Sequence, residues 1–176
     1  MAFRSDYRKL PSALYRRIHA AIRDLPFDIY KGMAAGLAGA GAVAAFLLLQ
    51  AETGLLPRFD LIGALGELTF TGRTGGWIVH FLVGALWGGL FAWLDPDLPG
   101  DTLAQRGVAI GFGAWFLMMM FLMPLAGYGL FALEIGILAT LFALLLHVAF
   151  GYVTGRIYAL LILQAAPLRF RSLRRR

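Results

Sequence analysis

Residues 75–94, with the sequence GGWIVHFLVGALWGGLFAWL, form a long apolar segment in which His80 is the only ionisable side chain. A helix of about 20 apolar residues is long enough to cross the hydrocarbon core of a lipid bilayer. After the histidine, Gly84, Gly88 and Ala92 recur at four-residue steps, so these small residues share one helical face. The segment therefore predicts a membrane-spanning helix that packs closely against another helix along that face.

Three further segments, at 32–51, 107–126 and 138–162, are comparably long and apolar. The chain of 176 residues is 60% apolar and only 15% charged, and its mean hydropathy is +0.73. A soluble protein of this size could not bury so much apolar surface, so lipid must solvate much of it. The sequence thus predicts an all-α membrane protein whose four transmembrane helices form two helical hairpins.

The distribution of lysine and arginine predicts the orientation of these helices. Most cations lie in the N-terminal arm, the 95–106 loop and the C-terminal tail, and the other two loops hold only Arg58 and Arg73. By the positive-inside rule, both termini are expected in the cytoplasm. The arm lacks an apolar region ending at a cleavage site, so we do not expect a secretory signal peptide. We divide the chain into a cytoplasmic basic arm (1–30), a transmembrane domain (31–163) and a basic cytoplasmic tail (164–176).

Residues 12–25, SALYRRIHAAIRDL, predict a basic amphipathic helix that lies on the inner leaflet. Its apolar residues fall on one helical stripe and its cations fall mostly off that stripe. Each cation close to anionic lipid contributes about 1 kcal/mol to membrane binding. Docking of this helix on a partner protein is the alternative. We expect the cations at the membrane surface to be Arg16, Arg17, Arg23, Arg169, Arg171 and Arg174.

The two halves of the chain share a sequence pattern. The segment KGMAAG from Lys31 matches RGVAIG from Arg106 at an offset of 75 residues. The frame H-x3-G-x3-G-x3-A begins at His80 and again at His147, 67 residues later. Both halves are expected to begin and end on the cytoplasmic side. The pattern therefore predicts parallel repeats related by a pseudo-two-fold axis along the membrane normal.

Each predicted span also carries a GxxxG pair. In lipid no hydrophobic effect draws helices together, so close backbone approach over small residues supplies much of the association energy. We expect the helix-packing residues to be Gly32, Gly36, Gly84, Gly88, Gly107, Gly111, Gly151 and Gly155.

His80 and His147 are the candidate cofactor-binding residues, because ionisable side chains inside a membrane are costly and usually functional. Both are expected to face neighbouring helices. One interpretation is a neutral imidazole that hydrogen-bonds a neighbouring helix. The others are axial ligation of a haem b or another tetrapyrrole pigment, a quinone contact, or a proton relay. Helices at glycine-contact distance leave little room for a porphyrin.

Several chemistries are not indicated by the sequence. It has no Walker loop, no GxSxG elbow and no HExxH motif. The absence of cysteine excludes disulfides and thiolate ligands. Two histidines are too few for a metal site, so we expect none. Topology already explains the basic arms, so we expect no nucleic-acid partner. No catalytic residues are identified, and the sequence favours a non-enzymatic role.

Three features occur together in this chain: the histidine–glycine helix, the DPDLPG loop at 95–100 and the MPLAG helix end at 123–127. With this combination the chain resembles a family of small four-helix bacterial inner-membrane proteins of uncharacterised function. The resemblance covers residues 31–162. It implies a bacterial, integral protein with four spans, and it assigns no activity, cofactor or catalytic residue.

The expected function is that of a small accessory or assembly subunit that docks its glycine-rich faces on a larger membrane complex, with bioenergetic and photosynthetic complexes as candidates. Bound lipid, a partner complex or a homo-oligomer, and anionic lipid at the cytoplasmic face are the expected partners. The alternative is an electron-transfer protein that uses His80 and His147 to bind haem, pigment or quinone. A small transporter or channel is the weakest alternative.

Overall fold

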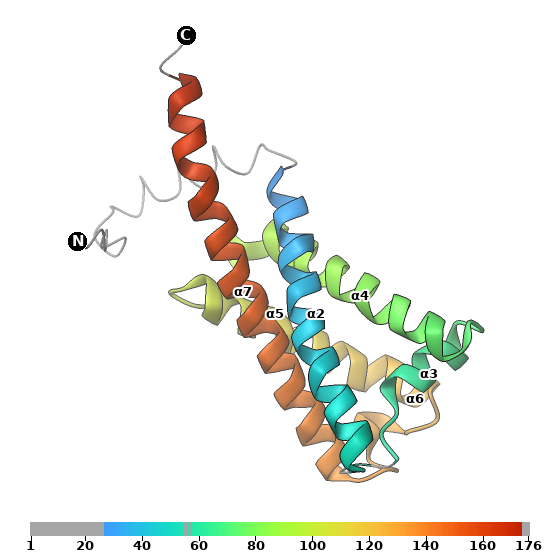
Figure 1. The fold of residues 1–176 in the computed structure, drawn as a ribbon. Coiled ribbons are helices and arrows are strands. Elements are labelled where there is room, and N and C mark those ends of the chain that lie inside the picture. The colour runs from blue at the N-terminus through green and yellow to red at the C-terminus, as the bar shows by residue number, and fades with distance from the viewer. Residues whose placement is uncertain (1–26, 55, 57, 174–176) are drawn as a thin grey trace.

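A computed structural model describes residues 27–54, 56 and 58–173, and within these residues all regular structure is helical. The long elements are α2 (Phe27–Thr53), α4 (Gly72–Leu94), α5 (Leu103–Leu117) and α7 (Ile137–Leu173). Shorter elements connect them (Figure 1): α3 (Leu61–Leu68), η2 (Asp95–Asp97), η3 (Met118–Leu122), α6 (Met123–Leu125) and η4 (Leu130–Ala132).

Four helices of the described chain are long and apolar enough to cross a membrane, as the sequence predicts. They cover Asp28–Thr53, Gly72–Leu94, Leu103–Leu125 and Ile137–Leu163. Each predicted span is too short at one or both ends; α2, for example, begins five residues before position 32, directly after Pro26. The predicted limits mark where the apolar run stops, whereas the backbone hydrogen bonds of a helix continue into polar sequence.

The helices pack in the order α4, α2, α7 and α5. α2 packs extensively against α4 and α7, and α5 packs against α7, whereas α4 and α5 contact each other little. The start of α2 and the end of α7 lie at the same end of the bundle, and α3 and α6 lie toward the opposite end (Figure 1). We call the end that carries α3 the distal end.

α3 was not predicted as a helix. The apolar face of α3 is buried against α4. Asp60 begins the helix by accepting a hydrogen bond of 3.0 Å from the Gly63 backbone N–H. Leu61, Ile62 and Leu65 belong to the main apolar core. α3 therefore extends this core to the distal end of the bundle.

The third span is interrupted by a π-helical turn, η3. Within it the Met123 N–H donates to the Met118 carbonyl, five residues back. Pro124 follows directly and lacks an N–H of its own, so a regular α-helical bond could not form there. Met119 and Met123 are fully buried and fill the core around this turn.

Candidate functional site

The GxxxG pairs of α2 and α4 meet each other. A Cβ added at Gly36 would collide with the Gly84 carbonyl oxygen and would lie 2.8 Å from the Gly88 Cα. A Cβ at Gly32 would lie 2.5 Å from the Ala92 Cβ. The two backbones therefore approach more closely than any side chain larger than hydrogen allows at these positions.

The GxxxG pairs of α5 and α7 also meet each other, but in a different register. A Cβ at Gly107 would collide with the Gly151 carbonyl and would lie 3.0 Å from the Gly155 nitrogen. A Cβ at Gly111 would collide with the His147 carbonyl. In the first hairpin Gly36 of α2 lies against Gly84 and Gly88 of α4. In the second hairpin Gly111 of α5, which matches Gly36, lies against His147 and Gly151 of α7. The second hairpin is thus offset by four residues, or about 6 Å of helix rise.

These contacts change one expectation about docking. The GxxxG faces were expected to receive a larger complex, but their glycines are covered by backbone of the same chain. A partner protein would have to bind another surface. Gly41 on α2 and Gly113 on α5 differ, because nothing lies within 4 Å of a Cβ placed at either position.

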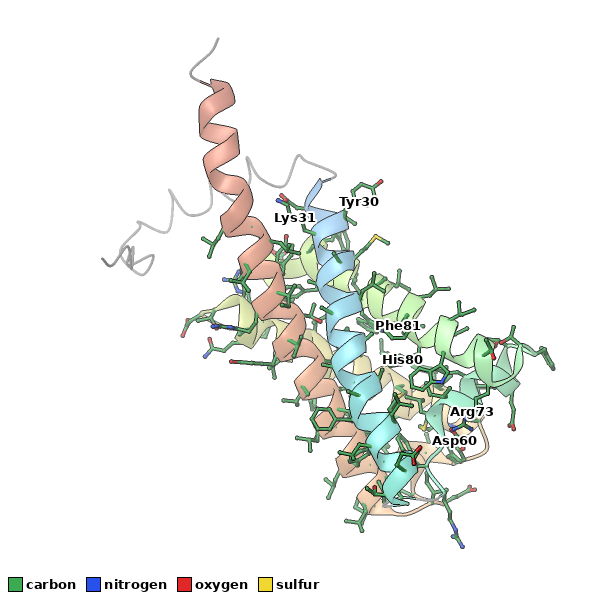
Figure 2. All side chains as sticks on the ribbon, in the orientation of Figure 1. Tyr30, Lys31, Asp60, Arg73, His80 and Phe81 are labelled. Carbon is green, nitrogen blue, oxygen red and sulfur yellow. The ribbon has the colours of Figure 1, made fainter. Side chains whose placement is uncertain are left out.

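His80 projects from α4 toward α2 (Figure 2). Its Nε2 lies 3.1 Å from the Ala40 carbonyl oxygen of α2. A carbonyl can only accept, so Nε2 carries the proton and donates. The ring also contacts Trp77 and Phe81 edge-on, with centroid distances of 5.9 and 5.3 Å. His80 is therefore held on three sides between two helices.

His147 makes no such bond to a neighbouring helix. Its Nδ1 lies 2.8 Å from the Ala143 carbonyl oxygen of its own helix and donates to it. His80 is thus hydrogen-bonded to a neighbouring helix, and His147 is hydrogen-bonded within its own helix.

The hydrogen bonds of the two imidazoles decide whether both histidines could ligate one haem. A ligating imidazole normally binds iron through one nitrogen while its other N–H is held by a carbonyl or carboxylate. His147 has the carbonyl half of that arrangement, because its Nδ1 donates to Ala143. His80 uses Nε2 for Ala40, and its helix packs on α2 at glycine-contact distance. A bis-histidine haem does not fit this arrangement.

We expect His80→Leu to lower the free energy of unfolding by about 0.6–1.7 kcal/mol, the usual worth of an interhelical hydrogen bond in a membrane protein. His147→Leu removes only a bond within α7 and should cost less. Equilibrium unfolding in mixed micelles of both variants measures these differences. A larger cost for His147 than for His80 would contradict this prediction.

The matched cations of the two halves both form ion pairs at the end of the bundle opposite α3. Arg106 Nη1 lies 3.0 Å from the Asp95 carboxylate, and only 3% of the Asp95 side chain is exposed. Lys31 lies 3.0 Å from the Asp28 carboxylate, one turn earlier in α2. Arg106 also donates to the Gly100 carbonyl and so closes the loop between α4 and α5.

The predicted membrane-surface cations cannot be placed. Residues 12–25, with Arg16, Arg17 and Arg23, lie outside the described residues, as does Arg174. The backbone of α7 extends to Leu173, but the side chains of Arg169 and Arg171 are also outside the description. The amphipathic arm therefore remains a prediction.

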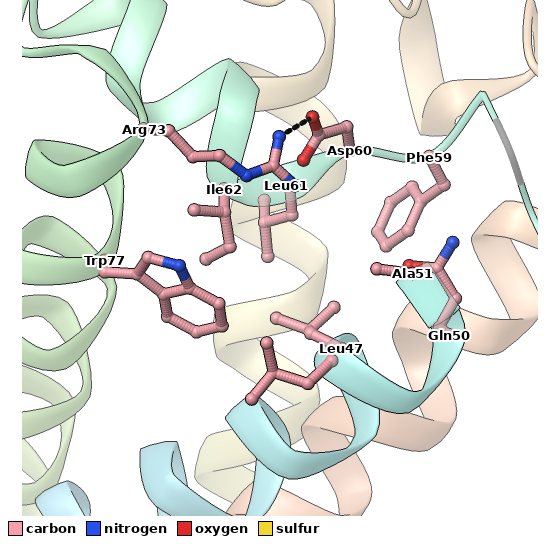
Figure 3. Close-up of a pocket in the computed structure, with 10 residues that line it drawn as sticks. Leu47, Gln50, Ala51, Phe59, Asp60, Leu61, Ile62, Arg73 and Trp77 are labelled. Carbon is pink, nitrogen blue, oxygen red and sulfur yellow. Dashed lines mark hydrogen bonds and ion pairs between the residues drawn. The ribbon is translucent and has the colours of Figure 1, made fainter. Parts of the chain in front are cut away.

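A cavity that the sequence did not predict lies at the distal end, between α2, α3 and α4 (Figure 3). Its volume is about 70 Å³, and most of its lining is apolar, including Leu47, Phe59, Ile62 and Trp77. Gln50, Asp60 and Arg73 supply its polar side chains. Arg73 Nη1 lies 2.8 Å from Asp60 Oδ2. The sequence signals for this site were weak: Arg73 stands just before a predicted span, and Asp60 stands beside an apolar segment.

Tyr128 lies near the same acid. Burial raises the pKa of Tyr128, and the carboxylates of Asp60 and Glu67 add to this effect, while a hydrogen bond to the Asp60 backbone opposes it. The phenol is therefore neutral at physiological pH. Among the residues that the structure describes, no cluster of three histidine, aspartate or glutamate side chains could hold a metal ion.

One family model matches residues 27–167, and its description is a family of unknown function, DUF6789. The match covers all four candidate spans. No curated protein matches the chain, and no solved structure does.

Proposed function

The chain belongs to the DUF6789 family, and we propose that it is a small accessory or assembly subunit of a larger complex in the bacterial inner membrane. In this proposal the four helices span the bilayer and both termini are cytoplasmic. The positive-inside distribution supports this orientation. The common position of the start of α2 and the end of α7 agrees with it (Figure 1).

The observation that carries the proposal is the incomplete packing of α4 and of the α5–η3–α6 span. Only 33% and 28% of the most apolar stretches of these spans are buried, against 44% for α2 and 39% for α7. The two outer spans contact each other little, so each has one long helix packed beside it, and α4 additionally packs against the short helix α3. A partner helix would give them a second neighbour, as van der Waals packing in lipid favours.

Large side chains cover the unpacked faces of these spans. Aromatic residues dominate protein interfaces because they bury much area at a low cost in conformational entropy. Six of these large residues are each more than 40% exposed: Leu82, Leu86, Trp93, Phe112, Phe116 and Phe121. We call these six residues the outer face.

A photo-reactive amino acid at Leu86 or Phe116 tests the outer face in the native membrane. We expect both positions to cross-link to the same protein, which should also co-migrate with this chain in mild detergent. Leu145 on α7 is 63% exposed and serves as the control. It should cross-link to lipid alone.

Two results would contradict the proposal. Cross-links from Leu86 and Phe116 to lipid alone would show that no partner covers the outer face. Cross-links to a second copy of this chain would make it a homo-oligomer rather than a subunit of another complex.

The parallel repeat and the interfacial arm are finer parts of the proposal. Each hairpin brings its own GxxxG pairs together, which supports a common ancestral hairpin. The four-residue offset between the two hairpins then reflects later divergence. The arm, at residues 1–30, would anchor the subunit on anionic lipid.

The second candidate function, binding of a pigment or quinone, rests on His147. Its Nδ1 donates to the Ala143 carbonyl, as the second nitrogen of a ligating imidazole usually does. A reduced-minus-oxidised absorption spectrum of the protein from its native membrane tests this function. An absorption band that disappears in His147→Leu would favour ligand binding, and a flat spectrum would exclude a haem or coloured pigment.

A further inference from the structure

We propose that the distal cavity binds one phospholipid, with the lipid phosphate on Arg73, an ammonium headgroup on Asp60 and the start of an acyl chain among the apolar lining residues. This inference rests on the proposal that the helices span a bilayer. It does not depend on a partner protein.

The residues that line the cavity reach both an apolar and a polar part of the protein surface. Leu48 lines it and is 54% exposed on α2, and in the proposed arrangement the acyl chain reaches the cavity past this residue. Arg73 and Asp60 stand together at the polar side (Figure 3), with 61% and 43% of their side chains exposed. An occupant therefore meets apolar walls and an ion pair at once.

The ion pair still has capacity for a ligand. Arg73 uses Nη1 for Asp60, and a guanidinium has five N–H donors in a planar fork that suits phosphate. Asp60 Oδ2 accepts from Arg73 and Oδ1 accepts from Gly63, while a carboxylate offers about four acceptor sites. A cation and an anion side by side complement the phosphate and ammonium of a zwitterionic headgroup.

The size of the cavity limits what enters it. At about 70 Å³ it is roughly half the volume of a 150 Å³ cavity that holds benzene, so it takes only a short part of a chain. Trp77 stands beside it at the start of α4, and tryptophan is enriched at the headgroup level of membranes. A lipid at the distal interface satisfies both conditions.

Native mass spectrometry of the full-length protein with added phosphatidylethanolamine tests the site. We expect Arg73→Gln to weaken binding of the first lipid about tenfold, the usual effect of losing one charge-assisted contact. Arg58→Gln is the matched control, because Arg58 is exposed at the same end but does not line the cavity. Equal losses in the two variants would overturn the proposal and indicate diffuse attraction to the headgroups.

Asp60→Asn tests recognition of the ammonium group. Asparagine is as good a helix N-cap as aspartate, so α3 should remain intact. The wild type should prefer phosphatidylethanolamine over phosphatidylglycerol, and this variant should lose the preference. Glu52→Gln, at an exposed carboxylate near the same end, should keep it. No preference in the wild type would overturn the assignment to Asp60.

Inorganic phosphate distinguishes a lipid from a free anion. At millimolar concentration it should not displace the bound lipid, because it lacks the apolar chain. Displacement would show that the site recognises phosphate alone. The two proposals can fail separately. If the cavity binds lipid but the cross-linking experiment finds no partner on the outer face, this inference holds and the proposed function does not.

Discussion

Gly36→Ala is expected to lower the free energy of unfolding by about 1–3 kcal/mol, the usual cost of adding a methyl group to a filled interior. The new Cβ would collide with the Gly84 carbonyl and press on Gly88. Both neighbours are helix backbone, which cannot rotate away as a side chain can. Relief therefore requires a shift of α4, and that shift also strains the His80–Ala40 hydrogen bond.

Gly41→Ala is the matched control, because it makes the same change five residues further along α2. No atom lies within 4 Å of a Cβ at this position, and alanine favours helix by up to about 1 kcal/mol over glycine. The control should keep or raise stability. Equilibrium unfolding of both variants in mixed micelles, followed by circular dichroism, measures the difference. Equal stability of the two variants would show that glycine contact does not hold the hairpin.

Arg106→Gln is expected to lower the free energy of unfolding by about 3 kcal/mol, because it removes the guanidinium that pairs with a buried carboxylate. The Asp95 carboxylate is 3% exposed and the Arg106 side chain 12% exposed. Arg106 also donates to the Asp95 and Gly100 carbonyls, so its loss loosens the loop between α4 and α5.

Two further variants isolate the ion pair. Arg73→Gln breaks the exposed Arg73–Asp60 pair and should cost less than about 1 kcal/mol. Asp95→Asn combined with Arg106→Gln should recover part of the loss, since no carboxylate is then left buried. The same unfolding measurement applies to all three proteins. A cost for Arg106→Gln no larger than for Arg73→Gln would contradict the prediction.

The sequence predicts the four spans because a run of about 20 apolar residues has few other uses. The GxxxG spacing also indicates which helical faces approach closely, but it does not state which helix meets which. The order α4, α2, α7, α5 depends on contacts between distant residues, and no local pattern encodes it.

The parts that sequence reasoning missed are the irregular ones. α3 is only eight residues long, and its apolar residues read equally well as an interfacial segment. The π turn at Met118–Leu122 has no signature of its own beyond the proline that follows. The distal cavity forms between three elements, so Arg73 and Asp60, 13 positions apart, meet only after folding.

The four-residue spacing of the glycines makes their contact degenerate. If one helix shifts along its partner by one turn, each glycine again meets a small residue. The glycine spacing alone therefore permits more than one register between the two helices. The two hairpins adopt alignments that differ by one such step. A contact that does not recur every turn is needed to select one of them. In the first hairpin His80 provides it through Ala40, and in the second Trp115 provides it by donating to the Thr140 carbonyl. These two side-chain hydrogen bonds therefore fix the register of helix pairs whose glycine contacts alone would permit several registers.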